Sequence, residues 1–217
     1  MRGVMMERVV RWTLNGVRQP PFLCTPEHLD DLALGYLLNA GMVDGPDSVT
    51  SIEVGENEVA VRTAYVPRPM APIDERLDRL APLSGDWRVS VPSLKAWADE
   101  LTGEERYYGT HRIGLFGPQG AIFREDIGRH NAADKAIGAA VRRGWDLSRC
   151  ALGATGRISL EILAKAASAG IPVLFSKKYP SDLSGDYASR LNLGIAAQIQ
   201  SAEPVLSGAV WRFDNRG

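Results

Sequence analysis

Residues 150–175 read CALGATGRISLEILAKAASAGIPVLF, and this stretch decides the fold class of the chain. Small and apolar residues at 150–154 predict a buried strand. The helix that follows repeats apolar residues at helical spacing and ends at Gly170, before a second apolar strand at 171–175. Strands that alternate with helices in this way are typical of a mostly parallel sheet covered on both faces. The sequence therefore predicts an α/β domain in the C-terminal half.

The same alternation extends on both sides of this stretch. A Gly-Pro-Gln-Gly turn at 117–120 separates two apolar strands, and small residues repeat at helical spacing after residue 130. These further elements are two strands at 113–116 and 121–123 and three helices at 92–101, 131–143 and 182–193. We expect a three-layer α/β/α domain over residues 91–217.

The N-terminal part has a different pattern. An alternating strand at 8–14 leads into Asn15-Gly16, a strong hairpin signal, and a return strand runs towards Cys24. Thr25-Pro26 opens a helix that Gly41 stops. A second strand pair follows, and the stretch 65–90, with four prolines, is predicted to be a linker or a long functional loop. Residues 1–90 are therefore predicted to be a smaller α+β domain.

Composition and the absence of export signals bear on where the chain works. It has 217 residues, of which 45% are hydrophobic and 24% are charged. No apolar run approaches the ~20 residues that span a bilayer, and the first residues lack the apolar core of a signal peptide. The two cysteines, Cys24 and Cys150, are expected to be free thiols in a reducing compartment. We expect a cytoplasmic location and no membrane contact.

Charge is divided unevenly along the chain. Residues 1–105 hold 10 Lys/Arg and 17 Asp/Glu, whereas residues 106–178 hold 12 Lys/Arg and 5 Asp/Glu. The basic part is suited to a negatively charged partner, although attraction between the two halves of one protein explains the same division.

The stretch 125–138, EDIGRHNAADKAIG, crowds charged, imidazole and amide side chains around a helix start. It belongs to one of three predicted transitions from strand to helix, at 124–131, 155–159 and 176–182. In an open α/β sheet such transitions gather at one edge, where helix N-termini and arginines bind phosphate. The candidate ligand-binding residues are His111, Arg124, Asp126, Gly128, Arg129, His130, Asn131, Thr155, Gly156, Arg157, Ser159, Ser176, Lys177 and Lys178.

Several of these residues have alternative interpretations. His130 fits a general acid or base, a phosphate ligand or a core imidazole. Asn131 is also placed to cap the helix, with Asp134 completing a capping box. Glu161 and Lys165, four residues apart, are typical of an exposed pair on a helix.

Other classes of site find little support in the sequence. Three scattered histidines and two distant cysteines give no recognisable metal-ligand spacing, so no structural metal is expected. The H-x-E and P-C-x-x-C motifs of zinc nucleobase deaminases are absent. No reader motif accompanies the basic half, so nucleic acid is not the expected partner.

The sequence resembles the FdhD family, the formate dehydrogenase accessory sulfurtransferases. The resemblance covers most of the chain and rests on four segments. These are Thr25-Pro26 with the DLALGYLL stretch at 31–38, Gly109-Thr110-His111, the EDIGRHNA block at 125–132 with Asp134-Lys135, and TGRISLE at 155–161 followed by AGIP at 169–172.

The resemblance implies a C-terminal domain with a fold like that of cytidine deaminase, without the deaminase zinc. It also implies a homodimer that binds the bis-guanine-dinucleotide form of the molybdenum cofactor. Such proteins pass sulfur from a cysteine desulfurase to that cofactor before it enters formate dehydrogenase, so both enzymes are implied partners. In these terms Arg129, His130 and Arg157 would contact phosphate or guanine, Gly128 and Gly156 would admit close backbone approach, and Lys177 and Lys178 would attract the anion.

The chain departs from the family at the sulfur-carrying loop. The family carries persulfide on a C-x-x-C loop before the C-terminal domain, whereas the corresponding stretch here, at 80–85, has no cysteine. One hypothesis is a cofactor-binding accessory protein without its own cysteine relay. The second is an active sulfurtransferase that uses Cys24, the candidate catalytic residue, or a thiol of a partner. The third is a binder of another nucleotide or of RNA. The segment after Gly194 also departs from the family pattern.

Overall fold

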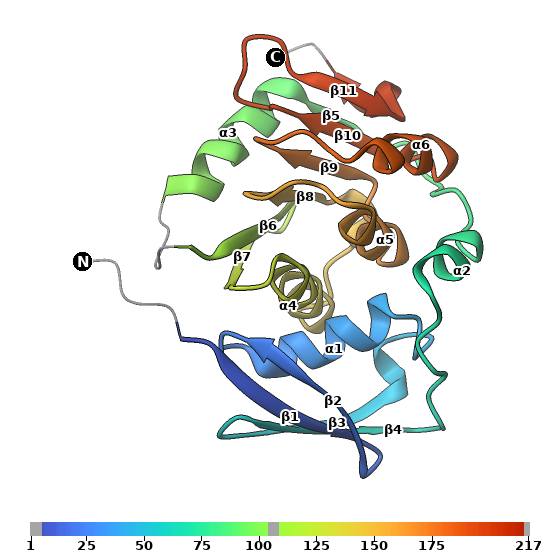
Figure 1. The fold of residues 1–217 in the computed structure, drawn as a ribbon. Helices are drawn as coiled ribbons and strands as arrows, with labels where there is room; N and C mark the ends of the chain where they lie inside the picture. The colour runs from blue at the N-terminus through green and yellow to red at the C-terminus, as the bar shows by residue number, and fades with distance from the viewer. Residues whose placement is uncertain (1–5, 104–108, 215–217) are drawn as a thin grey trace.

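A computed structural model describes residues 6–103 and 109–214 of the chain (Figure 1). The N-terminal part is a four-stranded sheet covered by one helix, α1 (Leu29–Asn39). The strands lie in the order β2-β1-β4-β3, with two antiparallel hairpins joined by the parallel pair β1–β4. Their bounds are β1 Arg8–Leu14, β2 Val17–Cys24, β3 Val49–Gly55 and β4 Glu58–Thr63.

The first predicted hairpin is confirmed. Asn15 and Gly16 both have positive φ, 51° and 81°, as a two-residue hairpin turn requires. Alternate residues of β1 then face α1, where Trp12 stacks on Phe22 at a centroid distance of 5.1 Å. This small apolar core explains why the N-terminal strands and α1 form one layered unit.

The C-terminal part is built on a six-stranded sheet in the order β11-β10-β9-β8-β6-β7. The strands are β6 His111–Gly117, β7 Gly120–Asp126, β8 Ala151–Ala154, β9 Val173–Ser176, β10 Gly194–Ala197 and β11 Val205–Gly208. Only the pairs β8–β9 and β9–β10 are parallel in this described sheet, so the prediction of a mostly parallel sheet is wrong. The reason is that β6 and β7 form a hairpin, and β6 also runs antiparallel to β8.

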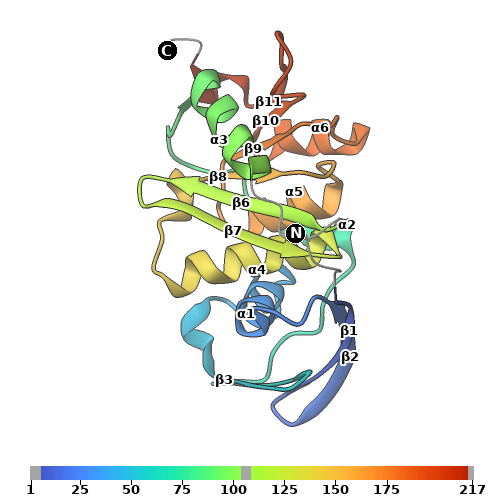
Figure 2. The same ribbon diagram turned by 90° about the vertical axis from the view of Figure 1, so that its left-hand side faces the viewer.

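Helices cover both faces of this sheet, which confirms the predicted α/β/α layering (Figures 1 and 2). One face carries α4 (Arg129–Arg142), α5 (Leu160–Ser168) and α6 (Asp182–Arg190). The other face carries α3 (Val91–Gly103), next to a short parallel pair of β5 (Val89–Ser90) and β12 (Phe213–Asp214). Single 3₁₀ turns lie at Pro46–Ser48, Leu147–Arg149 and Val210–Arg212. The specific likeness to cytidine deaminase stays a prediction.

The proline-rich stretch is more ordered than a linker. It contains a helix, α2 (Ile73–Asp78), whose Leu77 is completely buried in the core between the C-terminal sheet and α4–α6. The side chain of Arg76 on α2 forms an ion pair of 2.8 Å with Glu161 on α5. The helix α2 therefore packs on the C-terminal part of the chain.

The two parts of the chain meet where α1 crosses α4 (Figure 1). Glycine is required at this crossing, because a Cβ on Gly35 would collide with the backbone oxygen of Asp134. A Cβ on Gly138 would collide in the same way with the backbone oxygen of Asp31. The helices therefore touch backbone to backbone. Within the described ranges, no helix is long and apolar enough to span a bilayer.

Candidate functional site

Residues that follow two of the predicted strands, β7 and β8, come together beside the start of β6. Because β6 runs antiparallel to β7 and β8, its first residue, His111, pairs with Asp126 at the end of β7 and lies next to the loop that follows β8. Gly156 in that loop lies against the imidazole, since a Cβ there would be 3.0 Å from His111 Nδ1 and 3.9 Å from Arg129 Cδ. The sheet therefore brings His111, Arg129 and Gly156, three of the predicted site residues, close together.

The first turn of α4 adds the second imidazole. Arg129 Nε donates a hydrogen bond of 3.3 Å to His130 Nε2, and Ser159 Oγ, just before α5, lies 3.5 Å from the same nitrogen. Burial, together with the positive charges of Lys165 and Arg129, holds the pKa of His130 below its usual value. Burial and Arg129 also lower the pKa of His111. Both imidazoles are therefore neutral at neutral pH.

Arg129 differs from the arginines around it. Arg124, Arg142 and Arg76 each form an ion pair with a carboxylate. In contrast, the terminal nitrogens of half-buried Arg129 have no acceptor among the residues that the structure describes. The terminal nitrogens of a partly buried guanidinium without a carboxylate remain available to bind an anion.

Two exposed cations extend the same region. Arg157, in the loop after β8, and Lys178, in the loop after β9, have no carboxylate partner among the described residues. The Lys177 side chain instead donates to Thr102 Oγ1 at 3.0 Å. In the described chain neither α4 nor α5 has a side-chain cap at its N-terminus, so backbone N–H donors of both first turns remain for a ligand.

Two further candidate residues, Thr155 and Ser176, form hydrogen bonds that hold the loops after β8 and β9. Thr155 Oγ1 accepts a hydrogen bond of 3.0 Å from the Arg112 backbone N–H. Ser176 Oγ donates to the Gly156 carbonyl at 2.8 Å and accepts from the Lys178 N–H at 3.0 Å. These bonds fix the position of Gly156 beside His111. Thr155 and Ser176 therefore support the site through its backbone.

The structure corrects the interpretation of Asn131 as a helix cap. The N-cap of α4 is Gly128, whose own N–H donates to Asp126 Oδ1 at 2.8 Å. Asn131 lies within the first turn, where its amide donates to the Leu23 carbonyl at 2.8 Å and to Asp126 Oδ1 at 3.2 Å. Asp134 is fully buried and accepts from Lys165, so it does not complete a capping box.

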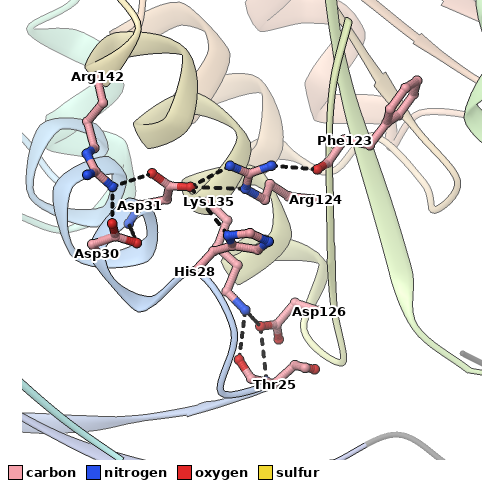
Figure 3. Close-up of polar contacts among 9 residues, drawn as sticks. All are labelled: Thr25, His28, Asp30, Asp31, Phe123, Arg124, Asp126, Lys135 and Arg142. Atoms are coloured by element: carbon pink, nitrogen blue, oxygen red, sulfur yellow. Dashed lines mark hydrogen bonds and ion pairs between the residues drawn. The ribbon is translucent and has the colours of Figure 1, made fainter. Parts of the chain in front are cut away.

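Arg124 and Asp126 bind other parts of the protein (Figure 3). Asp126 is 0% exposed and accepts hydrogen bonds from Thr25 N–H at 3.1 Å and from Lys135 Nζ at 2.6 Å. Arg124 donates to Asp31 of α1 at 2.7 Å and to the Phe123 carbonyl at 2.9 Å. These two side chains join the C-terminal sheet to the N-terminal part, and their predicted contact with a ligand is corrected accordingly.

Cys24 lacks the properties of a sulfur carrier. Its side chain is 0% exposed, and burial raises the pKa of the thiol to about 12. Cys150 is also 0% exposed, with a pKa raised by burial to about 11. A relay needs an accessible thiolate, so both cysteines are core residues.

One buried network was missed at the sequence level. Lys165 donates to both oxygens of Asp134, at 2.7 and 2.9 Å, and Asn39 of α1 donates to the same carboxylate at 2.6 Å. The prediction of an exposed Glu161–Lys165 pair is therefore wrong for Lys165, which is 4% exposed. The small residues around Lys165 on α5 are the signal of a buried position. Among the described residues, no three His, Cys, Asp or Glu side chains are grouped to hold a metal ion.

The fold and the arrangement of the signature residues define the class of protein. The sequence matches the FdhD/NarQ family over residues 5–206, and the chain belongs to this family. It is 34% identical over 230 residues to the sulfur carrier protein FdhD of Anaeromyxobacter dehalogenans, covering 86% of this chain and 80% of that protein. It is 30% identical over 207 residues to the sulfur carrier protein FdhD of Methanothermobacter thermautotrophicus, covering 85% and 80%.

A solved structure has the same fold. The crystal structure of a putative formate dehydrogenase accessory protein from Desulfotalea psychrophila superposes with a TM-score of 0.85. The match covers 98% of this chain and 91% of that one, at 24% sequence identity. This likeness extends over both parts of the chain.

Proposed function

We propose that this chain is an accessory protein for formate dehydrogenase maturation that binds the guanine-dinucleotide form of the molybdenum cofactor. The binding site is the region formed by His111, Arg129, His130, Gly156 and Ser159, with Arg157 and Lys178 at its rim. The observation that carries the proposal is that Arg129 is half-buried and that its terminal guanidinium nitrogens have no acceptor in the described chain.

The chemistry of the site fits a pyrophosphate. Arginine presents paired N–H groups that match two phosphate oxygens, and uncapped helix N-termini add N–H donors and partial positive charge. Both kinds of donor occur at the starts of α4 and α5. The absence of a Cβ at Gly156 lets the His111 imidazole pack against this loop, beside Arg129. The relatives' name, sulfur carrier protein FdhD, supports a role in sulfur transfer. That the molybdenum cofactor receives the sulfur is what the family resemblance implies.

The sulfur step needs a thiol from another protein under this proposal. The only cysteines in the sequence, Cys24 and Cys150, are far apart and form no C-x-x-C pair. Both are buried with raised pKa values. The chain would therefore hold the cofactor, in a cytoplasmic homodimer, while a cysteine desulfurase or its acceptor delivers sulfur before transfer to formate dehydrogenase.

Calorimetric titration with guanosine diphosphate tests the proposal. The wild-type protein is expected to bind it, and Arg129→Ala should weaken binding by about 1–3 kcal/mol through loss of a charged hydrogen bond. Arg143→Ala is the matched control, because Arg143 is exposed at the other end of the same helix. Absence of wild-type binding, or equal affinities for wild type and Arg129→Ala, would overturn the proposal.

A further inference from the structure

We infer that His130 is a positioning residue that acts on the phosphate through Arg129. In the neutral form, with its proton on Nδ1, the imidazole accepts the Arg129 Nε–H bond and holds the guanidinium so that its two terminal nitrogens face the ligand. This inference rests on the proposed function and specifies how its central arginine is oriented.

The tautomer of His130 follows from the identity of its partner. An arginine side chain has five N–H donors and no acceptor, so the nitrogen that it contacts must carry a lone pair. The contact joins Arg129 Nε to His130 Nε2 at 3.3 Å. His130 Nε2 is therefore unprotonated, and the single proton of the neutral ring lies on Nδ1. Ser159, 3.5 Å from the same Nε2, has a hydroxyl that is also able to donate.

The charges around His130 favour the neutral ring. Lys165 of α5, Arg129 of the same helix and His111 of β6 all disfavour protonation of the His130 ring. Glu161 of α5 favours protonation, but its effect is weaker than that of Lys165 or Arg129. Lys165 is itself fixed by both oxygens of Asp134 at 2.7 and 2.9 Å. The acceptor on His130 is thus maintained by cations on two neighbouring helices.

The hydrogen bond selects one way of binding phosphate. A guanidinium binds two oxygens either through Nε and one terminal nitrogen or through both terminal nitrogens. In Arg129 the Nε is already engaged by His130, so the end carrying Nη1 and Nη2 remains. Gly156 packs near Arg129 Cδ and His111, which limits movement of the arginine stem. His130 therefore fixes the geometry of the phosphate contact without touching the phosphate.

Substitutions at His130 separate this role from direct contact. A glutamine amide oxygen reaches about where Nε2 lies, whereas an asparagine amide reaches about where Nδ1 lies. His130→Gln should bind guanosine diphosphate within about twofold of wild type, while His130→Asn and His130→Ala should bind about five- to tenfold more weakly. Adding His130→Ala to Arg129→Ala should cause no further loss, because both substitutions remove one coupled contact. His28→Asn is the control, since His28 is exposed and its φ of 53° is one that asparagine accepts.

Three results would overturn the inference while leaving the proposed function intact. They are rescue by asparagine rather than glutamine, additive losses in the double variant, and full affinity of His130→Ala. Nitrogen NMR of the wild-type histidines gives an independent test without nucleotide: a proton on Nδ1 of His130 is expected, and a proton on Nε2 would contradict the inference. Failure of the wild type to bind the nucleotide would instead count against the proposed function.

Discussion

Asp126 and Lys135 form an ion pair of 2.6 Å in which both side chains are 0% exposed. Both belong to the 125–138 stretch that resembles the family signature, yet their partners are the backbone N–H and carbonyl of Thr25, next to the last strand of the first hairpin. Figure 3 shows this contact together with the Arg124–Asp31 and Arg142–Asp31 pairs. The signature therefore serves two purposes: part of it binds the N-terminal part of the chain, and part of it forms the candidate site.

Lys135→Met should destabilise the protein by about 3–5 kcal/mol, because it leaves the Asp126 carboxylate buried without its cation. The free energy of unfolding from urea denaturation measures this effect. Arg79→Met is the control, since it breaks an exposed pair in which Arg79 is 65% and Glu75 is 55% exposed, and it should change stability by less than about 1 kcal/mol. A similar decrease in the free energy of unfolding in both variants would contradict the claim that the buried pair contributes more to stability than the exposed pair.

Gly138→Ala should destabilise the crossing of α1 and α4. The new Cβ would meet the backbone of Asp31, which has no flexible end to move aside, and overpacking of this kind costs about 1–3 kcal/mol. Gly185→Ala on α6 has open space around the new methyl group and should instead stabilise by up to about 1 kcal/mol. Thermal unfolding of the two variants compares them directly, and an unchanged midpoint for Gly138→Ala would contradict the close helix contact.

Acidification should lower stability through the histidines. The pKa of His130 is lowered from 6.5 in the folded protein, so the unfolded chain takes up the proton first. The contribution of neutral His130 to the free energy of unfolding is fully present above the unfolded pKa of 6.5. It is lost as pH falls through the pKa of the folded protein. Urea midpoints at about pH 7.5 and about pH 5.5 should therefore differ less for His130→Gln than for wild type. Equal differences would contradict the lowered pKa. Comparing the two proteins also removes the opposite effect of Asp134, whose pKa burial raises.

Both cysteines should resist alkylation in the folded protein. Their thiols are buried, with pKa values of about 12 and about 11 for Cys24 and Cys150, so little thiolate forms at neutral pH. Intact mass spectrometry after treatment with iodoacetamide should show labelling only after denaturation. Incubation with a cysteine desulfurase and cysteine should likewise leave no persulfide on Cys24. Rapid native labelling, or a persulfide at that residue, would return Cys24 to the role of sulfur carrier.

Local sequence signals predicted the elements whose structure depends on neighbours in the chain. Asn15-Gly16 predicts the first hairpin because two residues with positive φ are enough to make that turn. The helix α2 was missed because four prolines in 65–90 hide a six-residue helix whose stability comes from burying Leu77 elsewhere. The strands β10 and β11 after α6 were missed as well, since each has only four residues.

Part of the candidate site was predicted from the sequence, and part was not. Arg129 and Gly156 were found because they follow strands of one sheet, and His111 because it enters a strand after a loop. The structural roles of Arg124 and Asp126 were not found, because their partners Asp31 and Thr25 lie 93 and 101 positions away in the sequence. A charged side chain at a strand end looks the same whether it faces a ligand or another part of the chain. Only the three-dimensional contact with α1 separates the two.

The structure of the complex with guanosine diphosphate tests the central claim most directly. The diphosphate is expected within hydrogen-bond distance of both terminal nitrogens of Arg129, between the starts of α4 and α5. A cavity of about 590 Å³ at the other end of α4, lined by Arg68, Arg76 and Arg79, is the alternative location. Nucleotide bound in that cavity, with Arg129 unoccupied, would contradict the account.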